Sequence, residues 1–286
     1  MLLYPAGLTG NSMPMRSIRE RVALLWSDRR TDPPPPALLS RGQCLLGLLG
    51  GVFLTLAFGL SYTTGNQHQY LLLGFRLSEP DFIPADWLTW RTTHYHFAFG
   101  YLLYLLHRLG PLPFMSVLVH AMTMIAFSFG LLLLSRRYCK YSALAFAVVI
   151  LFRAIAGPSE LGVGLFYLVC GYLQPSQIAG PLLVLGLALL FHRRAHLAGF
   201  ALGIAGLFHT AFMVIGCVLA WLTVLASGMW RRPKSLLGLC IPLLFLWGAN
   251  CAVTARTMFK RQGSTREAAS ILLNYRSPHH FVVSSW

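Results

Sequence analysis

Long apolar runs, separated by short polar or basic segments, set the pattern of this 286-residue chain. Several runs approach the ~20 residues with which a helix crosses a bilayer. The pattern predicts an all-α fold, a polytopic transmembrane helix bundle with about seven spans. The predicted spans are 44–62, 112–134, 143–156, 174–191, two short spans within 197–227 that turn near Gly203, Gly206 and His209, and 236–253.

The polar stretch after the first span, the predicted outer loop 63–111, is where we expect the function to lie. Short interfacial pieces are predicted at 70–77 and 82–90. From His94 to Arg108 the apolar residues recur at helical spacing, but ~15 residues are few for a span. We therefore predict that this last helix lies flat on the membrane surface.

Composition and charge support the membrane class. The chain is 56% hydrophobic and 11% charged, whereas a soluble domain carries roughly 25% charge. The formal net charge of +15 arises from basic clusters between apolar runs, which is a topology signal and an attraction to anionic lipid. Nucleic acid is excluded as a partner on this ground. With the predicted helix flat, most basic residues fall on the cytoplasmic side; five in the final segment fit this poorly.

Three segments follow from this topology. Residues 1–42 form a basic, proline-rich cytoplasmic segment, 43–256 the transmembrane core, and 257–286 an extracytoplasmic basic segment. The expected location is the cell inner (plasma) membrane, multi-pass, with the N-terminus cytoplasmic. The final segment stops where another outer loop is expected, so the chain is either complete or the first part of a larger protein. No C-x-x-C spacing occurs, so neither a disulfide framework nor a zinc site is predicted.

Asp81 and Asp86 are the candidate catalytic residues in the outer loop. A carboxylate at the membrane surface can act as a general base on an acceptor hydroxyl, or hold a divalent cation such as Mg or Mn. Capping of short surface helices explains both residues equally simply. Arg76, Arg91 and, less readily, Arg153 suit phosphate binding, although snorkelling to lipid headgroups explains them as well.

The histidines carry a weaker signal. His94 and His96 do not share one face of a helix, and contacts with lipid phosphate or backbone are favoured over a metal pair. His120, within the second predicted span, is expected to be a satisfied polar residue, and His209 a turn residue near the outer side. The glycine clusters at 47–51 and 199–206 are expected to mediate close helix packing.

The order of one span, an acidic outer loop, a flat helix and a span ending in a basic turn resembles the GT-C membrane glycosyltransferases. The likeness covers most of residues 43–286, and it extends to a group of uncharacterised bacterial membrane proteins with a GT-C-like layout. It is carried by GNQHQYLLLGFRLSEPDF, HYHFAFGYLLYLLHRLGPLPFMSVLVHAMTMIAFSFGLLLLSRRYCK, YLQPSQIAGPLL, LAGFALGIAGLFHTAFMVI and RSPHHF.

This resemblance implies an integral membrane enzyme that moves a hexosyl or pentosyl group from a polyprenyl-phosphate donor at the outer face. By position, the key acidic residue falls on Asp81 or Asp86, although the family's adjacent acidic pair is missing. Membrane lipids and the donor are the implied partners. The alternative is a non-catalytic multi-pass protein, transporter-like or an envelope-assembly subunit. The candidate substrate-binding residues are Arg76, Arg91, His94, His96, Glu160, Arg276, His279 and His280.

Overall fold

The computed structural model describes residues 38–62, 67–79, 81–84, 96–156 and 169–259. The chain divides into two compact units, 1–38 and 39–286, and every helix below belongs to the second. Within the described ranges the structure is all-helical, with no strand. The helices are α2 (Arg41–Phe58), α3 (Gln67–Ser78), α5 (Phe97–Leu109), α6 (Leu112–Tyr138), α7 (Ser142–Ala156), α9 (Pro175–Phe191), α10 (Ala195–Phe208), α11 (Thr210–Ser227), the 3₁₀ helix η1 (Met229–Arg231) and α12 (Pro233–Phe259).

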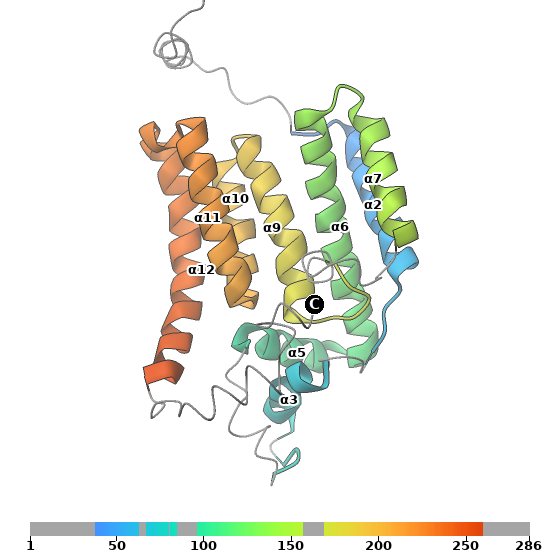
Figure 1. Ribbon diagram of the computed structural model, residues 1–286. Coiled ribbons are helices and arrows are strands. Elements are labelled where there is room, and N and C mark those ends of the chain that lie inside the picture. The colour runs from blue at the N-terminus through green and yellow to red at the C-terminus, as the bar shows by residue number, and fades with distance from the viewer. Residues whose placement is uncertain (1–37, 63–66, 80, 85–95, 157–168, 260–286) are drawn as a thin grey trace, which may run out of the picture. The chain divides into compact units, whose positions relative to one another are not determined.

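The longer helices pack side by side in the order α12, α10, α9, α6 and α2. α7 packs on α6 and α2, while α11 packs on α10 and α9. α3 and α5 pack on each other, and α5 also contacts α6 and α10. Figure 1 shows α5 crossing the ends of the long helices instead of running alongside them.

Glycines set how closely the long helices approach, as their spacing predicted. On α2, a Cβ at Gly51 would lie 2.5 Å from the Ile125 Cα of α6. The Ser128 hydroxyl of α6 donates to the Gly47 carbonyl at 2.7 Å, which ties the same two helices together. On α10, a Cβ at Gly199 would meet the Leu239 carbonyl of α12 at 2.5 Å. Small residues at such contacts are typical of packing in membranes, where backbones approach closely.

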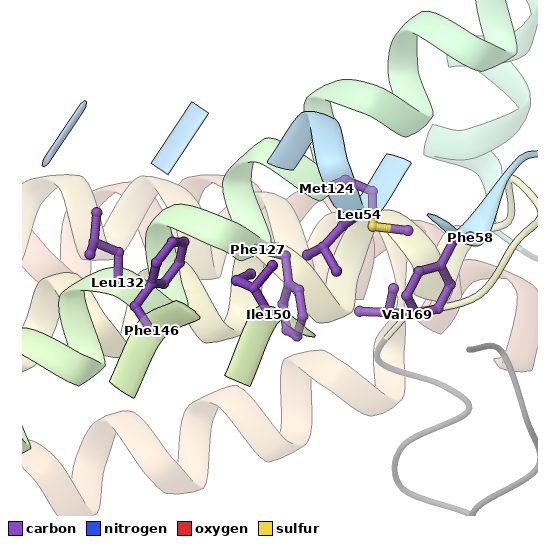
Figure 2. Close-up of a cluster of buried hydrophobic side chains, with 8 residues drawn as sticks. All are labelled: Leu54, Phe58, Met124, Phe127, Leu132, Phe146, Ile150 and Val169. Carbon is purple, nitrogen blue, oxygen red and sulfur yellow. The ribbon is translucent and has the colours of Figure 1, made fainter. Parts of the chain in front are cut away.

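A hydrophobic core fills the space between α2, α6 and α7, and it also includes a residue of the 169–174 segment. Figure 2 shows its side chains gathered between these helices. Large aromatic and branched side chains dominate the cluster, so dispersion contacts between them hold the three helices together. Its buried members are Leu54, Phe58, Met124, Phe127, Leu132, Phe146, Ile150 and Val169.

Four helices are long and apolar enough to cross a membrane: α2, α6, α11 and the Pro233–Val253 part of α12. α5, α7, α9 and α10 are apolar but shorter, at 10–17 residues. Large apolar side chains also point outward, such as Leu56 at 77% exposed and Phe245 at 79%. An outer surface of this kind fits lipid better than water. The chain is therefore a helical protein suited to a membrane.

Helix ends refine the predicted bounds. α2 begins earlier than the predicted span because Ser40 and Gln43 form a reciprocal capping box. It ends at Gly59, whose φ of 62° is outside the helical region. The apolar stretch 197–227 is broken at His209, as predicted. The expectation that Gly203 and Gly206 form the turn is wrong, because both lie within α10 and face α12.

Candidate functional site

Asp81 lies in an exposed turn, residues 81–84, directly after α3. The Phe82 amide donates to the Glu79 carbonyl at 3.0 Å, and the Phe82 ring packs on Phe75 of α3 with centroids 5.3 Å apart. Ile83 has a φ of 42°, which is a strained conformation for a β-branched residue. The turn that carries Asp81 is therefore anchored to α3 and holds an unfavourable backbone conformation.

Of the predicted phosphate-binding residues, Arg76 lies in the last turn of α3, five positions before Asp81. Arg76 and Asp81 therefore lie at the same end of α3, Arg76 within the helix and Asp81 just after it. Arg153, the other phosphate-binding candidate that the structure describes, is buried in α7, where its guanidinium carbon lies 5.3 Å from the centroid of the Phe58 ring. Apart from His96, the other candidates, together with the second catalytic candidate Asp86, fall outside the residues that the structure describes. They are Arg91, His94, Glu160, Arg276, His279 and His280.

His96 occupies the N-cap of α5 with a left-handed backbone, φ 56° and ψ 46°. Its Nδ1 lies 2.9 Å from the Phe208 carbonyl oxygen at the end of α10. Its ring stacks at a tilt on His209, with centroids 4.8 Å apart, and meets the edge of Tyr70 of α3 at 5.2 Å. Burial, and secondarily the neighbouring His209, lowers the pKa of His96 to about 3. The imidazole is therefore neutral at physiological pH.

The structure does not bring His96 and Asp81 together. His96 contacts Tyr70, in the first turn of α3, whereas Asp81 follows the helix's last turn. At 1.5 Å per residue, these two ends of α3 are roughly 15 Å apart. The predicted site residues therefore divide into an exposed Asp81–Arg76 end and a buried histidine cluster.

A second group of polar side chains is buried where α6 and α9 meet the 169–174 segment. The Gln177 side-chain oxygen accepts from the Cys170 amide at 2.6 Å, and Gln177 Nε2 lies 3.4 Å from His120 Nδ1. Gln174 Nε2 donates to the Cys170 sulfur at 3.4 Å. Burial raises the pKa of Cys170 to about 11, so its thiol stays protonated and is a poor nucleophile. This group fixes the segment onto α9.

The sequence contains one local signal for the group around Gln177, but the spacing of the acidic residues does not point to it. Gln174 and Gln177 are three apart at the start of an apolar helix, which places them on one face. Pro175 is the first residue of that helix and Gln174 its N-cap. The pairing of His96 with His209 had no local signal, because 112 residues separate them along the chain.

Basic residues gather at the other end of the long helices. The Arg136 guanidinium of α6 donates to Gln43 of α2 at 2.9 Å. His192 Nε2, after α9, lies 2.9 Å from the Leu133 carbonyl oxygen of α6. A Cβ at Gly238 of α12 would come 3.6 Å from the His196 Cβ of α10. The turns after α6, α9 and α11 therefore lie at one end, and α3 and α5 at the other (Figure 1).

Few side chains in the described part of the outer loop could ligate a divalent metal. Glu79 and Asp81 are the carboxylates there, and no group of three or more His, Cys, Asp or Glu side chains within them could hold a metal ion. Because Mg²⁺ and Mn²⁺ need several oxygen ligands, these residues do not by themselves form such a site.

Comparison of the chain with protein-family models, curated proteins and solved structures gave no match.

Proposed function

We propose that the protein is a membrane glycosyltransferase of the GT-C type, which transfers a sugar from a polyprenyl-phosphate donor at the outer face. The observation that carries this proposal is the strained, exposed Asp81 turn, anchored to α3 in the loop between the first two long helices. Strained backbone is often concentrated at functional sites. In this proposal α5 lies flat at the membrane surface, and about seven helices span: α2, α6, α7, α9, α10, α11 and α12.

Asp81 serves as the general base in this scheme, with Asp86 as the second candidate. The base accepts the proton of the acceptor hydroxyl, whose oxygen attacks the anomeric carbon. The bond between that carbon and the phosphate oxygen breaks, and polyprenyl phosphate leaves. Arg76, at the same end of α3 as Asp81, stabilises the negative charge on the leaving phosphate. The other candidate contacts of the substrates remain Arg91, His94, His96, Glu160, Arg276, His279 and His280.

The basic end of the helices supports the orientation that this chemistry needs. Cationic turns tend to be retained in the cytoplasm, which supports an outer location for α3, α5 and Asp81, where no nucleotide-linked donor is expected. Several polar side chains of the long helices bond to other parts of the protein, as Ser128 does to Gly47 and Asn250 to Gly206. This internal pairing disfavours a water-filled conduit and hence the transporter-like alternative.

Loss of transfer in carboxamide variants tests the proposal. Membranes containing the full chain are supplied with radiolabelled hexoses and pentoses linked to polyprenyl phosphate, and incorporation into acceptor is measured. D81N or D86N is expected to reduce the rate by ~10²-fold or more, because a general base contributes about that much. The matched control E79Q changes an acidic residue two positions from Asp81 and should retain the wild-type rate within a few-fold.

Two outcomes would end this proposal. Wild-type rates in both D81N and D86N would remove the assigned base. Absence of transfer from every donor by the wild-type chain, at normal membrane abundance, would favour the non-catalytic alternative.

A further inference from the structure

The contact between His96 and His209 joins parts of the chain that belong to different helices. His96 caps α5, while His209 is the single residue between α10 and α11. Two imidazole rings at a centroid distance of 4.8 Å, tilted by 38°, are in direct contact. The position at which α5 meets the α10–α11 break is thus formed by two titratable groups of the same kind.

The break needs polar partners, and α5 supplies one of them. Where α10 ends, its last carbonyls lose their helical partners. Two of them are instead bonded by side chains: the Phe208 carbonyl by His96 at 2.9 Å and the Gly206 carbonyl by Asn250 of α12 at 2.7 Å. For His96 to donate this bond from Nδ1, a neutral ring must carry its proton there. This proton position leaves Nε2 as the basic nitrogen.

A positive charge on one imidazole is disfavoured by the other imidazole, which lies in direct contact with it. Protonation of either ring puts a cation against a second imidazole, and protonation of both puts two cations in contact. Among the described residues, the groups that face His96 are His209, the Phe208 carbonyl and the Tyr70 ring. Burial and His209 both lower the pKa of His96, and the Phe208 carbonyl opposes them only in part. Neither described carboxylate, Glu79 or Asp81, is among the groups that act on this pKa.

We propose that the His96–His209 contact is an acid-sensitive latch, which holds α5 against the α10–α11 break near neutral pH and releases it on acidification. In the released state both imidazoles are exposed to water and can take up protons. The population of the released state therefore rises relative to that of the latched state as pH falls. The left-handed backbone of His96 is free to relax in the same step, because release removes the ring contact with His209 and the bond to the Phe208 carbonyl. Release also frees α3, which packs on α5 and carries the Asp81 turn.

The direction of the pH dependence follows from the link between protonation and the stability of the latched state. A histidine whose pKa is lowered in the latched state stabilises that state above its ordinary pKa of ~6.5, and this stabilisation is lost as pH falls below that value. The pH window of release therefore begins near 6.5 and extends downward. Between pH 7.5 and pH 5 one group with a pKa of about 3 in the latched state and ~6.5 in the released state shifts the equilibrium roughly thirtyfold toward release.

Hydrogen–deuterium exchange of the full chain in lipid nanodiscs tests the latch. Exchange times are corrected for the intrinsic pH dependence of amide exchange. Peptides over 97–109 and 205–213 are expected to lose protection by roughly thirtyfold or more between pH 7.5 and pH 5, while peptides over 120–135 within α6 keep theirs. The double variant H96Q/H209F removes both titrations while retaining a hydrogen-bonding group and a ring, and it should lose the pH dependence.

The matched control is H192Q. His192 also places a ring nitrogen 2.9 Å from a backbone carbonyl oxygen, but at the opposite end of the helices, so this variant should keep the wild-type response. The latch is overturned if wild-type protection at 97–109 and 205–213 is the same at both pH values. It is also overturned if the folded double variant responds as the wild type does. Because the readout is exchange and not transfer, the result stands whether or not the proposed activity is found.

Discussion

Three non-glycine residues hold a positive φ within the described ranges: Ile83, His96 and Arg193. The first lies in the Asp81 turn and the second in the histidine latch. Such conformations cost of order 1–3 kcal/mol each and persist when the surroundings impose them. The neighbours of His96 do impose its conformation, through one hydrogen bond and two ring contacts. At both candidate sites, Ile83 and His96 therefore hold a backbone conformation that non-glycine residues disfavour.

Glycine conformation gives a direct test of the end of α2. Gly59 has φ 62° and ψ −172°, and nothing lies within 4 Å of where its Cβ would be. G59A should therefore destabilise the fold through backbone strain alone, by roughly 1–3 kcal/mol. G248A is the control, because Gly248 lies in the helix α12 with equally open space; it should stabilise by up to ~1 kcal/mol. Unfolding in detergent micelles measures both, and equal stability of the two variants would contradict this account.

Individual helices could be predicted from the sequence because apolar runs and caps are local signals. Short α3, the crossing helix α5 and the break at His209 all lie where the pattern placed them. Which glycines turn the chain and which face a neighbour could not be predicted, since Gly203 meets α12 through a contact set by packing. The latch and the Gln177–Cys170 bond were missed for the same reason. A polar residue on an apolar helix signals burial, but its partner depends on how the helices assemble.

The α2–α6 pair depends on the absence of a side chain at Gly51. A methyl group there would lie 2.5 Å from the Ile125 Cα, so the two helix backbones must separate. G51A should destabilise by ~1–3 kcal/mol, as overpacking does. G42A on the same helix places its methyl in open space, and it should be neutral or mildly stabilising. Resistance to SDS-induced unfolding compares the variants, and G51A as stable as G42A would show that this contact does not limit the approach.

Charge is unevenly distributed over the described part of the chain, because its carboxylates lie only at the α3–α5 end, which also carries Arg76 and Arg108. Its two carboxylates, Glu79 and Asp81, follow α3 at one end. The basic turns after α6, α9 and α11, together with the start of α2, lie at the other end. No carboxylate within the described ranges lies in those turns. A molecule divided in this way has a preferred orientation in a membrane, because cationic segments are retained on the cytoplasmic side and attracted to its anionic lipids.

Cysteine labelling in intact cells tests this orientation. Cys139 is exposed in the basic turn between α6 and α7, so a variant retaining it as the single cysteine should react with a membrane-impermeant maleimide after lysis and not before. An E79C change in a cysteine-free background should react in intact cells, because Glu79 is exposed at the other end. The two variants control each other for expression and reagent access. The reverse pattern would place Asp81 in the cytoplasm. A polyprenyl-linked donor on the outer face could not reach it there, so transfer by this loop would be ruled out. Labelling of both sites from one side would mean that the α6 helix between them does not cross the membrane.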